Sequence, residues 1–220
     1  MGFFEYYFEL DASKTENQVL CPFPHTVPNT TLVYHEQHPS AHVNLDKRTF
    51  HCKACSTGHS EHSFIQALYG CSFANASRLQ YLYQQCESSA EWDALSLNSD
   101  TQAILDSFNI SPAVAAELKL KSAANGGIMF PVIQHGCLLD IRTYTPGGSP
   151  KVKSRAGAPA GLIIPYQEWL DSNKITLICA GEKDMAVARS HGFNAITITG
   201  GENALPIQPE LFRDKRVVIV

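Results

Sequence analysis

The chain has 220 residues, of which 44% are hydrophobic and 17% are charged. This balance supplies enough apolar side chains for a buried core and excludes an intrinsically disordered protein. The formal net charge of -4 excludes a uniformly basic nucleic-acid-binding protein, so any phosphate-binding site must be a local patch. No apolar run reaches the length of a membrane span and the first residues lack a basic leader, so we expect a cytoplasmic protein with no membrane partner.

Two short segments carry the first candidate site. "CPFPH" contains Cys21 and His25, and "HCKAC" contains Cys52 and Cys55. We expect two strands, 42–45 and 49–51, joined by a polar turn, which would place the second cysteine pair on a knuckle of the kind that zinc ribbons use. Three thiolates and one imidazole form a tetrahedral set for structural Zn²⁺. A redox pair at Cys52 and Cys55 would need a different strand and helix context.

Other residues leave alternatives open at this site. His35 and His38, in "YHEQHPSAH", are rivals of His25 for the histidine ligand. The cysteines of both segments could also be buried thiols without a metal. Cysteine usage in a reducing compartment favours metal binding or burial over disulfides. We therefore expect the remaining four cysteines to be core residues: Cys71, Cys86, Cys137 and Cys179.

The segment "CPFPH", followed by "HPSAHVNLDKRTFHCKACSTGHSEHSFIQALYG", is similar to the zinc-binding domain of bacterial and bacteriophage primases. The resemblance implies a zinc ribbon that grips single-stranded DNA template, with His51 and Lys53 on the knuckle as DNA contacts. Two departures are the insertion "TVPNTTLVYHEQ" and a histidine one place later than the family spacing.

The middle of the chain has helical periodicity. We expect helices from Glu61 to Leu68, after a cap at Ser72, from Thr101 to Phe108 with Asp100 as cap, and after Ser111 with Pro112 at the first helical position. The helices that follow residue 70 form a helical linker. The phrase "FNISPAVAAELKL" resembles the short helical hairpin of phage primase-helicases.

The next segment combines a hairpin with a group of cations. Strands 128–133 and 137–144 are joined by a tight turn, and the loop that follows carries Lys151, Lys153 and Arg155, with Arg142 on the strand before it. Four cations without an acidic neighbour suit the phosphates of a nucleotide or a single strand, and the alternative is a solvated loop. The segment is similar to the basic half of the primase polymerase domain.

The terminal block predicts an α/β unit. A strand at 175–179, a helix at 183–191 and a strand at 195–199 imply a parallel pair with a right-handed crossover, and "RVVIV" adds a third strand. The block resembles the Toprim fold, in which carboxylates hold the catalytic metal. Ala180 stands where the family has glutamate, either as a natural variant or as an engineered change, so Glu182 and Asp184 are the remaining candidates for Mg²⁺ or Mn²⁺.

The expected fold class is α+β and α/β. We expect a zinc-ribbon DNA-binding domain (1–70), a helical linker (71–124), the basic N-terminal part of a primase-type RNA polymerase domain (125–170) and a partial, truncated Toprim domain (171–220). The resemblance implies a primase portion that binds template and ribonucleotides, with a replicative helicase domain C-terminal in the same parent chain. The alternative is a catalytically inactive module that binds single-stranded DNA and recruits a helicase.

Overall fold

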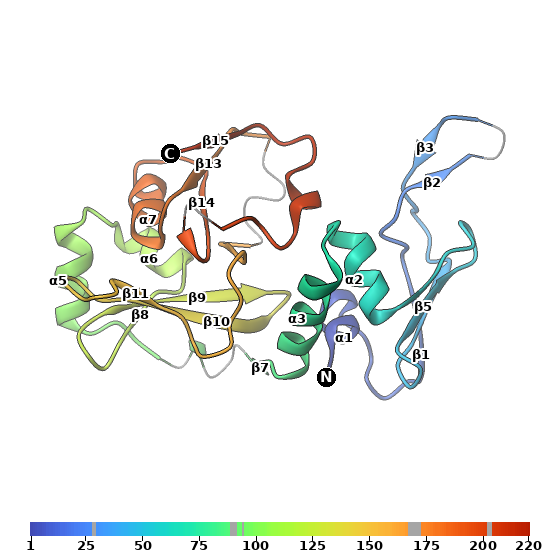
Figure 1. Cartoon of the computed structure of the whole chain (residues 1–220), viewed down its shortest axis with the longest axis horizontal. Helices are drawn as coiled ribbons and strands as arrows, with labels where there is room; N and C mark the ends of the chain where they lie inside the picture. The colour runs from blue at the N-terminus through green and yellow to red at the C-terminus, as the bar shows by residue number, and fades with distance from the viewer. Residues whose placement is uncertain (28–29, 89–91, 94, 167–172, 202–203) are drawn as a thin grey trace. The chain divides into compact units, whose positions relative to one another are not determined.

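The computed structural model describes residues 1–27, 30–88, 92–93, 95–166, 173–201 and 204–220. The chain forms two compact units, Met1–Gln85 and Cys86–Val220 (Figure 1). Both units combine helices with sheets, so the mixed α+β fold class predicted from the sequence is confirmed. The finer division into four domains stays a prediction. No helix of the described ranges is long and apolar enough to cross a bilayer.

The first unit is built on a four-stranded antiparallel sheet in the order β1-β4-β5-β6. Ala41 and Val43 of one strand and Phe50 and Cys52 of the next point to the core, because alternate residues of a strand face the same side. The predicted hairpin is therefore confirmed, with the first strand beginning and ending one residue earlier and the second strand one residue longer. The strands are β1 (Glu16–Val19), β4 (Ala41–Asn44), β5 (Thr49–Cys52) and β6 (Gly58–Ser60), and a separate hairpin joins β2 (His25–Thr26) to β3 (Val33–Tyr34).

Three helices complete the first unit: α1 (Phe3–Phe8), α2 (Glu61–Tyr69) and α3 (Phe73–Gln84). Ser72 caps α3 as predicted, since its side chain accepts a hydrogen bond from the backbone N–H of Asn75. The core between the helices is aromatic. The Phe3 ring meets the Tyr83 ring edge-on at 4.9 Å and the Tyr69 ring at 5.9 Å.

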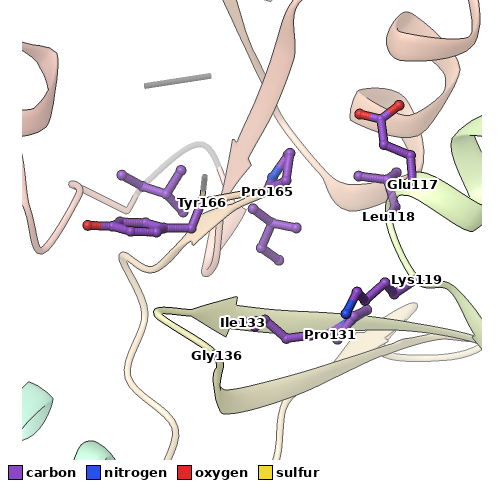
Figure 2. Close-up of a pocket in the computed structure, with 10 residues that line it drawn as sticks. Glu117, Leu118, Lys119, Pro131, Ile133, Gly136, Pro165 and Tyr166 are labelled. Atoms are coloured by element: carbon purple, nitrogen blue, oxygen red, sulfur yellow. The ribbon is translucent and has the colours of Figure 1, made fainter. Parts of the chain in front are cut away.

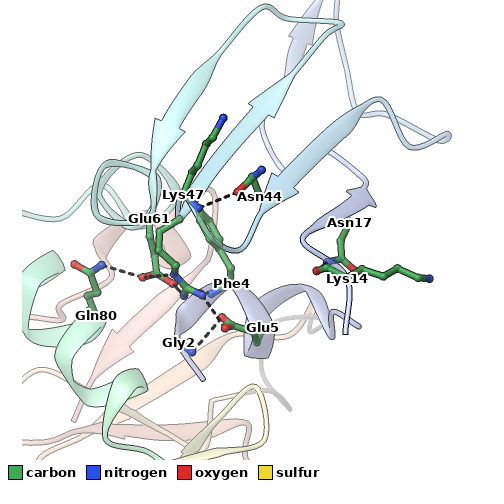
Figure 3. A network of polar contacts seen from close by, with 10 residues as sticks. Gly2, Phe4, Glu5, Lys14, Asn17, Asn44, Lys47, Glu61 and Gln80 are labelled. Atoms are coloured by element: carbon green, nitrogen blue, oxygen red, sulfur yellow. Dashed lines mark hydrogen bonds and ion pairs between the residues drawn. The ribbon is translucent and has the colours of Figure 1, made fainter. Parts of the chain in front are cut away.

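A buried carboxylate ties the helices of the first unit to its sheet (Figure 3). Glu61 is 1% exposed and accepts hydrogen bonds from the backbone N–H of Phe4 at 3.1 Å, from Gln80 Nε2 at 2.9 Å and from Arg48. Arg48, at the turn between β4 and β5, also pairs with Glu5 at 2.7 Å. Burial opposes ionisation of Glu5, but the hydrogen bond from Arg48 holds its pKa below the ordinary value. The network fixes α1, α2 and α3 against this turn.

The second unit contains a sheet built around the hairpin of β9 (Ile128–Gln134) and β10 (Cys137–Tyr144). His135 and Gly136 turn the chain with φ of 50° and 73°, the left-handed conformation that a tight hairpin requires. β11 (Val152–Lys153) and β7 (Glu87–Ser88) pair with β10, and β8 (Lys121–Ser122) pairs with β9.

Helices α5 (Ser99–Ser107) and α6 (Pro112–Glu117) precede this hairpin. The predicted cap of α5 is wrong: Asn98, not Asp100, begins the helix, because its side chain accepts a hydrogen bond from the N–H of Thr101 at 2.8 Å. Asp100 lies in the first turn instead. The cap of α6 at Ser111, followed by proline, is confirmed.

The second sheet of this unit has the order β12-β14-β13-β15. Its strands are β12 (Ile163–Ile164), β13 (Thr176–Cys179), β14 (Ala195–Ile198) and β15 (Val217–Ile219). β13 is parallel to β14 and to β15, and α7 (Glu182–Ser190) connects β13 to β14, so the predicted strand, helix and strand are confirmed. A short 3₁₀ helix covers Pro209–Phe212.

One prediction about cysteines is wrong. Cys86 and Cys137 form a disulfide, with their Cα atoms 5.8 Å apart, and are not free core thiols. The pairing of β7 with β10 explains this, because Ser88 lies opposite Cys137 and brings Cys86 beside it. Cys71 and Cys179 are free and buried, as expected.

Candidate metal centre and cationic segment

The structure brings Cys21, His25, Cys52 and Cys55 together in the first unit. Their ligand atoms all lie within 4.8 Å of one another. Cys21 precedes β2 and His25 begins it, whereas Cys52 ends β5 and Cys55 follows in the turn. Cys21, His25 and Cys52 are at most 4% exposed. His35 and His38, the rival candidates, are exposed and lie outside the group.

The separation of the ligand atoms fits a tetrahedral metal ion. The Sγ of Cys52 lies 3.7 Å from the Nε2 of His25. Bonds of about 2.0 to 2.3 Å from zinc to nitrogen and sulfur place two ligand atoms of a tetrahedron at about this separation. Nε2 is therefore the nitrogen of His25 that faces the cysteines, and Nδ1 has no hydrogen-bond partner among the described residues. A Cys₃His cluster of this form fits structural zinc.

Polar groups around the cluster hold its ligands in place. Glu36 accepts hydrogen bonds from the backbone N–H of Cys21 at 2.9 Å and from Ser40. The Ser40 hydroxyl lies 3.4 Å from Cys52 Sγ. Although burial opposes it, the hydrogen bonds from Ser40 and Cys21 hold the pKa of Glu36 below its ordinary value. Contacts of this second layer fix the orientation of metal ligands. Sequence analysis did not identify Glu36 or Ser40, because no spacing rule marks such supporting groups.

The burial and close spacing of the cysteine thiolates favour a bound cation. Burial, reinforced by Cys52 and Cys55, raises the pKa of the Cys21 thiol to about 12. Burial also acts on Cys52, but hydrogen bonds from Ser40 and from the backbone at Cys55 outweigh it and lower the pKa of Cys52. Three thiolates in this enclosure repel one another unless a positive ion lies between them. A bound divalent metal removes that cost and stabilises the fold that forms the site.

The predicted DNA contacts of the first unit lie on its surface. His51 and Lys53 are exposed, and His51 lies opposite His42 on the outer face of the sheet. Both residues flank Cys52, so the metal centre fixes the backbone that carries them. Their contact with DNA stays a prediction.

The four predicted phosphate contacts of the second unit divide into two groups. Lys153 and Arg155 line one pocket of about 440 Å³ together with Asn125 and Thr143. Lys151 and Lys153 are both exposed and are separated by one residue. Arg142 is directed elsewhere: its Nη1 contacts the Ser154 hydroxyl and its Nε lies 2.6 Å from Glu182 Oε1.

The predicted catalytic carboxylates do not converge. Glu182 is 3% exposed and ion-paired with Arg142, whereas the Asp184 side chain is 55% exposed and lies 2.9 Å from Lys183 Nζ. In the described part of the chain, the Cys₃His cluster is the single group of three or more His, Cys, Asp or Glu side chains that could hold a metal. Metal binding by Glu182 and Asp184 stays a prediction, and Ala180 offers no ligand beside them.

A smaller pocket of the second unit contains none of the predicted site residues (Figure 2). It has a volume of about 160 Å³ and is lined by apolar residues that include Pro131, Ile133 and Pro165. Glu117 and Lys119 also line it, but they form ion pairs with Arg189 and Asp93. The pocket therefore adds no unpaired charge to the candidate site.

The fold and the site together define a mixed α+β protein with a Cys₃His metal centre and a separate cation-bearing unit. A scan of protein-family models and a search of curated proteins find no match. Solved structures similar to the chain include DnaG-type primases. One is the zinc-binding and RNA polymerase domains of the Aquifex aeolicus primase, at 17% identity and a TM-score of 0.45, covering 99% of this chain and 68% of that chain.

Two further structures are also primases or contain primase domains. The E. coli primase catalytic core is similar at 16% identity and a TM-score of 0.45, covering 71% of this chain and 61% of that chain. A chain in the structure of the bacteriophage T7 lagging-strand DNA polymerase with primase domains of two gp4 subunits has 12% identity and a TM-score of 0.42, covering 89% of this chain and 78% of that one. Similarity at this level carries no residue's role across to this chain.

Proposed function

We propose that this chain is the primase portion of a phage or mobile-element DNA replication protein that binds single-stranded DNA template. The observation that carries the proposal is the Cys₃His cluster, whose β5 knuckle presents His51 and Lys53 to solvent. The second unit adds exposed cations at Lys151, Lys153 and Arg155. Cations along a strand-bearing surface attract the phosphates of a single strand and lose affinity as salt rises.

The zinc of this proposal is structural. Cys21, His25, Cys52 and Cys55 would supply all four ligands, which leaves no open position for a reacting water. The metal would fix the β5 knuckle and thereby hold His51 and Lys53 in one arrangement.

In the full parent protein, the second unit would join ribonucleotides by attack of a 3′-hydroxyl on a triphosphate, with release of pyrophosphate. A bound Mg²⁺ or Mn²⁺ supplies the charge neutralisation that this transfer needs. Asp184 is the exposed acid beside β13, and the three exposed cations would bind phosphate oxygens. We place this protein in the bacterial host cytoplasm, with a replicative helicase domain as its partner in the same parent chain.

A second candidate function is a module that binds single-stranded DNA and recruits a helicase without catalysis. Ala180 at the end of β13 and the ion pair of Glu182 with Arg142 favour it. Both leave this chain with few carboxylates for a catalytic metal.

Incorporation of labelled ribonucleotides on a mixed single-stranded template tests the proposal. The assay compares this chain, its Ala180→Glu variant and the longer parent chain, in Mg²⁺ and in Mn²⁺. Product from the parent chain, with little from this chain alone, is the expected result. Absence of product from all three would overturn the primase proposal in favour of the binding module.

A further inference from the structure

Asp140 is a buried carboxylate in the middle of β10 that no part of the proposed chemistry uses. It is 0% exposed. Its Oδ1 accepts hydrogen bonds from the backbone N–H of Arg155 at 2.9 Å and of Ile141 at 2.7 Å. Its Oδ2 has no hydrogen-bond partner among the described residues. A buried carboxylate costs free energy to retain, so its long-range hydrogen bond with the backbone of Arg155 needs an explanation.

That contact lies at the end of the cation-bearing segment, 151–155. At the start of the segment, the backbone N–H of Thr145 donates to the carbonyl of Lys151 at 2.8 Å. In the middle, Lys153 pairs with Thr143 of β10. At the end, beyond the last residue of β11, a side chain of β10 takes the place of the backbone acceptor: Asp140 accepts a hydrogen bond from the Arg155 N–H.

Arg142 makes a second contact from the same face of β10 to the end of this segment. Residues i and i+2 of a strand point to the same side, so Asp140 and Arg142 lie next to each other. Arg142 reaches the Ser154 hydroxyl with one nitrogen and Glu182, at the start of α7, with another. The end of the segment is thus joined through β10 to the helix that follows Ala180.

We propose that Asp140 is a positioning residue, which holds the 151–155 segment so that Lys153 and Arg155 face the same pocket and bind phosphates together. This inference rests on the proposed function, because it assigns the way in which the cations of that function are arranged. Two cations held on a fixed backbone lose less conformational entropy on binding an anion than two cations on a free loop. The segment is held by the hydrogen bond that the Asp140 oxygen accepts, and the charge of the carboxylate is not required for it.

Burial raises the pKa of Asp140 against the opposing hydrogen bonds from the backbone of Arg155 and Ile141. The neutral form of a carboxyl, and an asparagine, keep an oxygen that accepts those hydrogen bonds. Asp140→Asn therefore preserves the proposed contact, whereas Asp140→Ala removes it.

Hydrogen exchange of the Arg155 amide tests the contact without reference to activity. In Asp140→Ala we expect exchange to be about tenfold or more faster than in the native chain, because one hydrogen bond is lost. In Asp140→Asn we expect protection within about twofold of native, on the same estimate. Asp106→Asn, on α5, is the control for loss of one negative charge in the same unit. Native protection of Arg155 in Asp140→Ala would overturn the proposal, as would equal loss in both Asp140 variants.

Binding of a fluorescent single-stranded oligonucleotide tests the consequence. We expect Asp140→Ala to weaken binding about tenfold, an effect of the size of one lost contact, and Asp140→Asn to restore native affinity. Faster exchange without weaker binding would overturn the positioning role while leaving the proposed function intact. If the native chain does not bind the oligonucleotide, the proposed function fails and the positioning role with it, while exchange still reports whether Asp140 holds the segment.

Discussion

Arg142 and Glu182 form a buried ion pair that joins β10 to the first turn of α7. Their Nε and Oε1 atoms are 2.6 Å apart, and the two side chains are 12% and 4% exposed. Glu182 also lies at the N-terminus of α7, where a negative charge is favourable. The pair therefore fixes the helix that follows Ala180 against the sheet that carries the cations.

Removal of one member of this pair should destabilise the second unit. We expect Arg142→Ala to lower the free energy of unfolding by about 3 kcal/mol, because it leaves Glu182 buried and unpaired. Urea unfolding followed by tryptophan fluorescence measures this unit, since both tryptophans, Trp92 and Trp169, belong to it. The control is Arg213→Ala, which breaks an exposed pair with Glu210 and should cost less than about 1 kcal/mol.

The double variant of Arg142→Ala with Glu182→Ala separates the effect of losing the ion pair from the effect of shortening each side chain. It should cost less than the sum of the two single variants, because no unpaired charge remains. Strict additivity of the three measurements would show that the two residues act independently and would contradict the ion pair.

The metal centre predicts one zinc ion per chain. We expect Cys52→Ser to lower zinc content well below one equivalent, measured by elemental analysis after dialysis, because a ligand thiolate is lost. Cys71→Ala is the matched control, since Cys71 is a free, buried cysteine of the same unit outside the cluster. Equal zinc content in both variants would contradict the assignment of the four ligands.

His135 predicts a pH dependence of the second unit. Burial lowers the pKa of His135 to about 4 from an ordinary value of 6.5. Between those values the unfolded chain binds a proton that the folded chain does not, so the free energy of unfolding falls as pH falls from 6.5 to 4. The expected loss from this residue is about 3 kcal/mol.

His135→Asn should remove the part of the pH dependence of the free energy of unfolding that comes from His135. Asparagine tolerates the positive φ of this turn, and the loss of the ring contact with Tyr166 at 5.1 Å lowers stability alike at both pH values. Urea unfolding at pH 7 and pH 4.5 compares the two chains, and the carboxylates that also titrate are common to both. An unchanged pH dependence in the variant would refute the role given to His135.

Local sequence patterns predicted most helices and strands. They did not predict the contacts between residues far apart in the sequence. The β4–β5 hairpin, the caps at Ser72 and Ser111, and the unit from β13 to β14 follow from residues close in sequence. The four candidate metal ligands were found because short motifs mark them. β1 was missed because its sequence, ENQV, does not alternate apolar with polar residues, and one of its two buried residues is the polar Asn17.

The contacts of Asp140 and Glu182 could not be predicted in the same way. Arg155 is 15 residues from Asp140, and Glu182 is 40 residues from Arg142. A carboxylate inside "CLLDIRTY" carries no local sign of its partner, and Cys86 carries none of Cys137, 51 residues away. Such partners are set by the pairing of strands, which the sequence pattern leaves open.

The proposed function requires that the exposed cations of the second unit bind the phosphates of single-stranded DNA. The most direct measurement is the affinity of the zinc-loaded chain for a labelled single-stranded oligonucleotide across a series of salt concentrations, in the native chain and in a variant with Lys151→Ala, Lys153→Ala and Arg155→Ala. We predict salt-dependent binding in which the slope of log affinity against log salt concentration is smaller by about two in the variant, as expected for three lost phosphate contacts on a single strand. Binding with the same affinity and the same slope in both chains would contradict it.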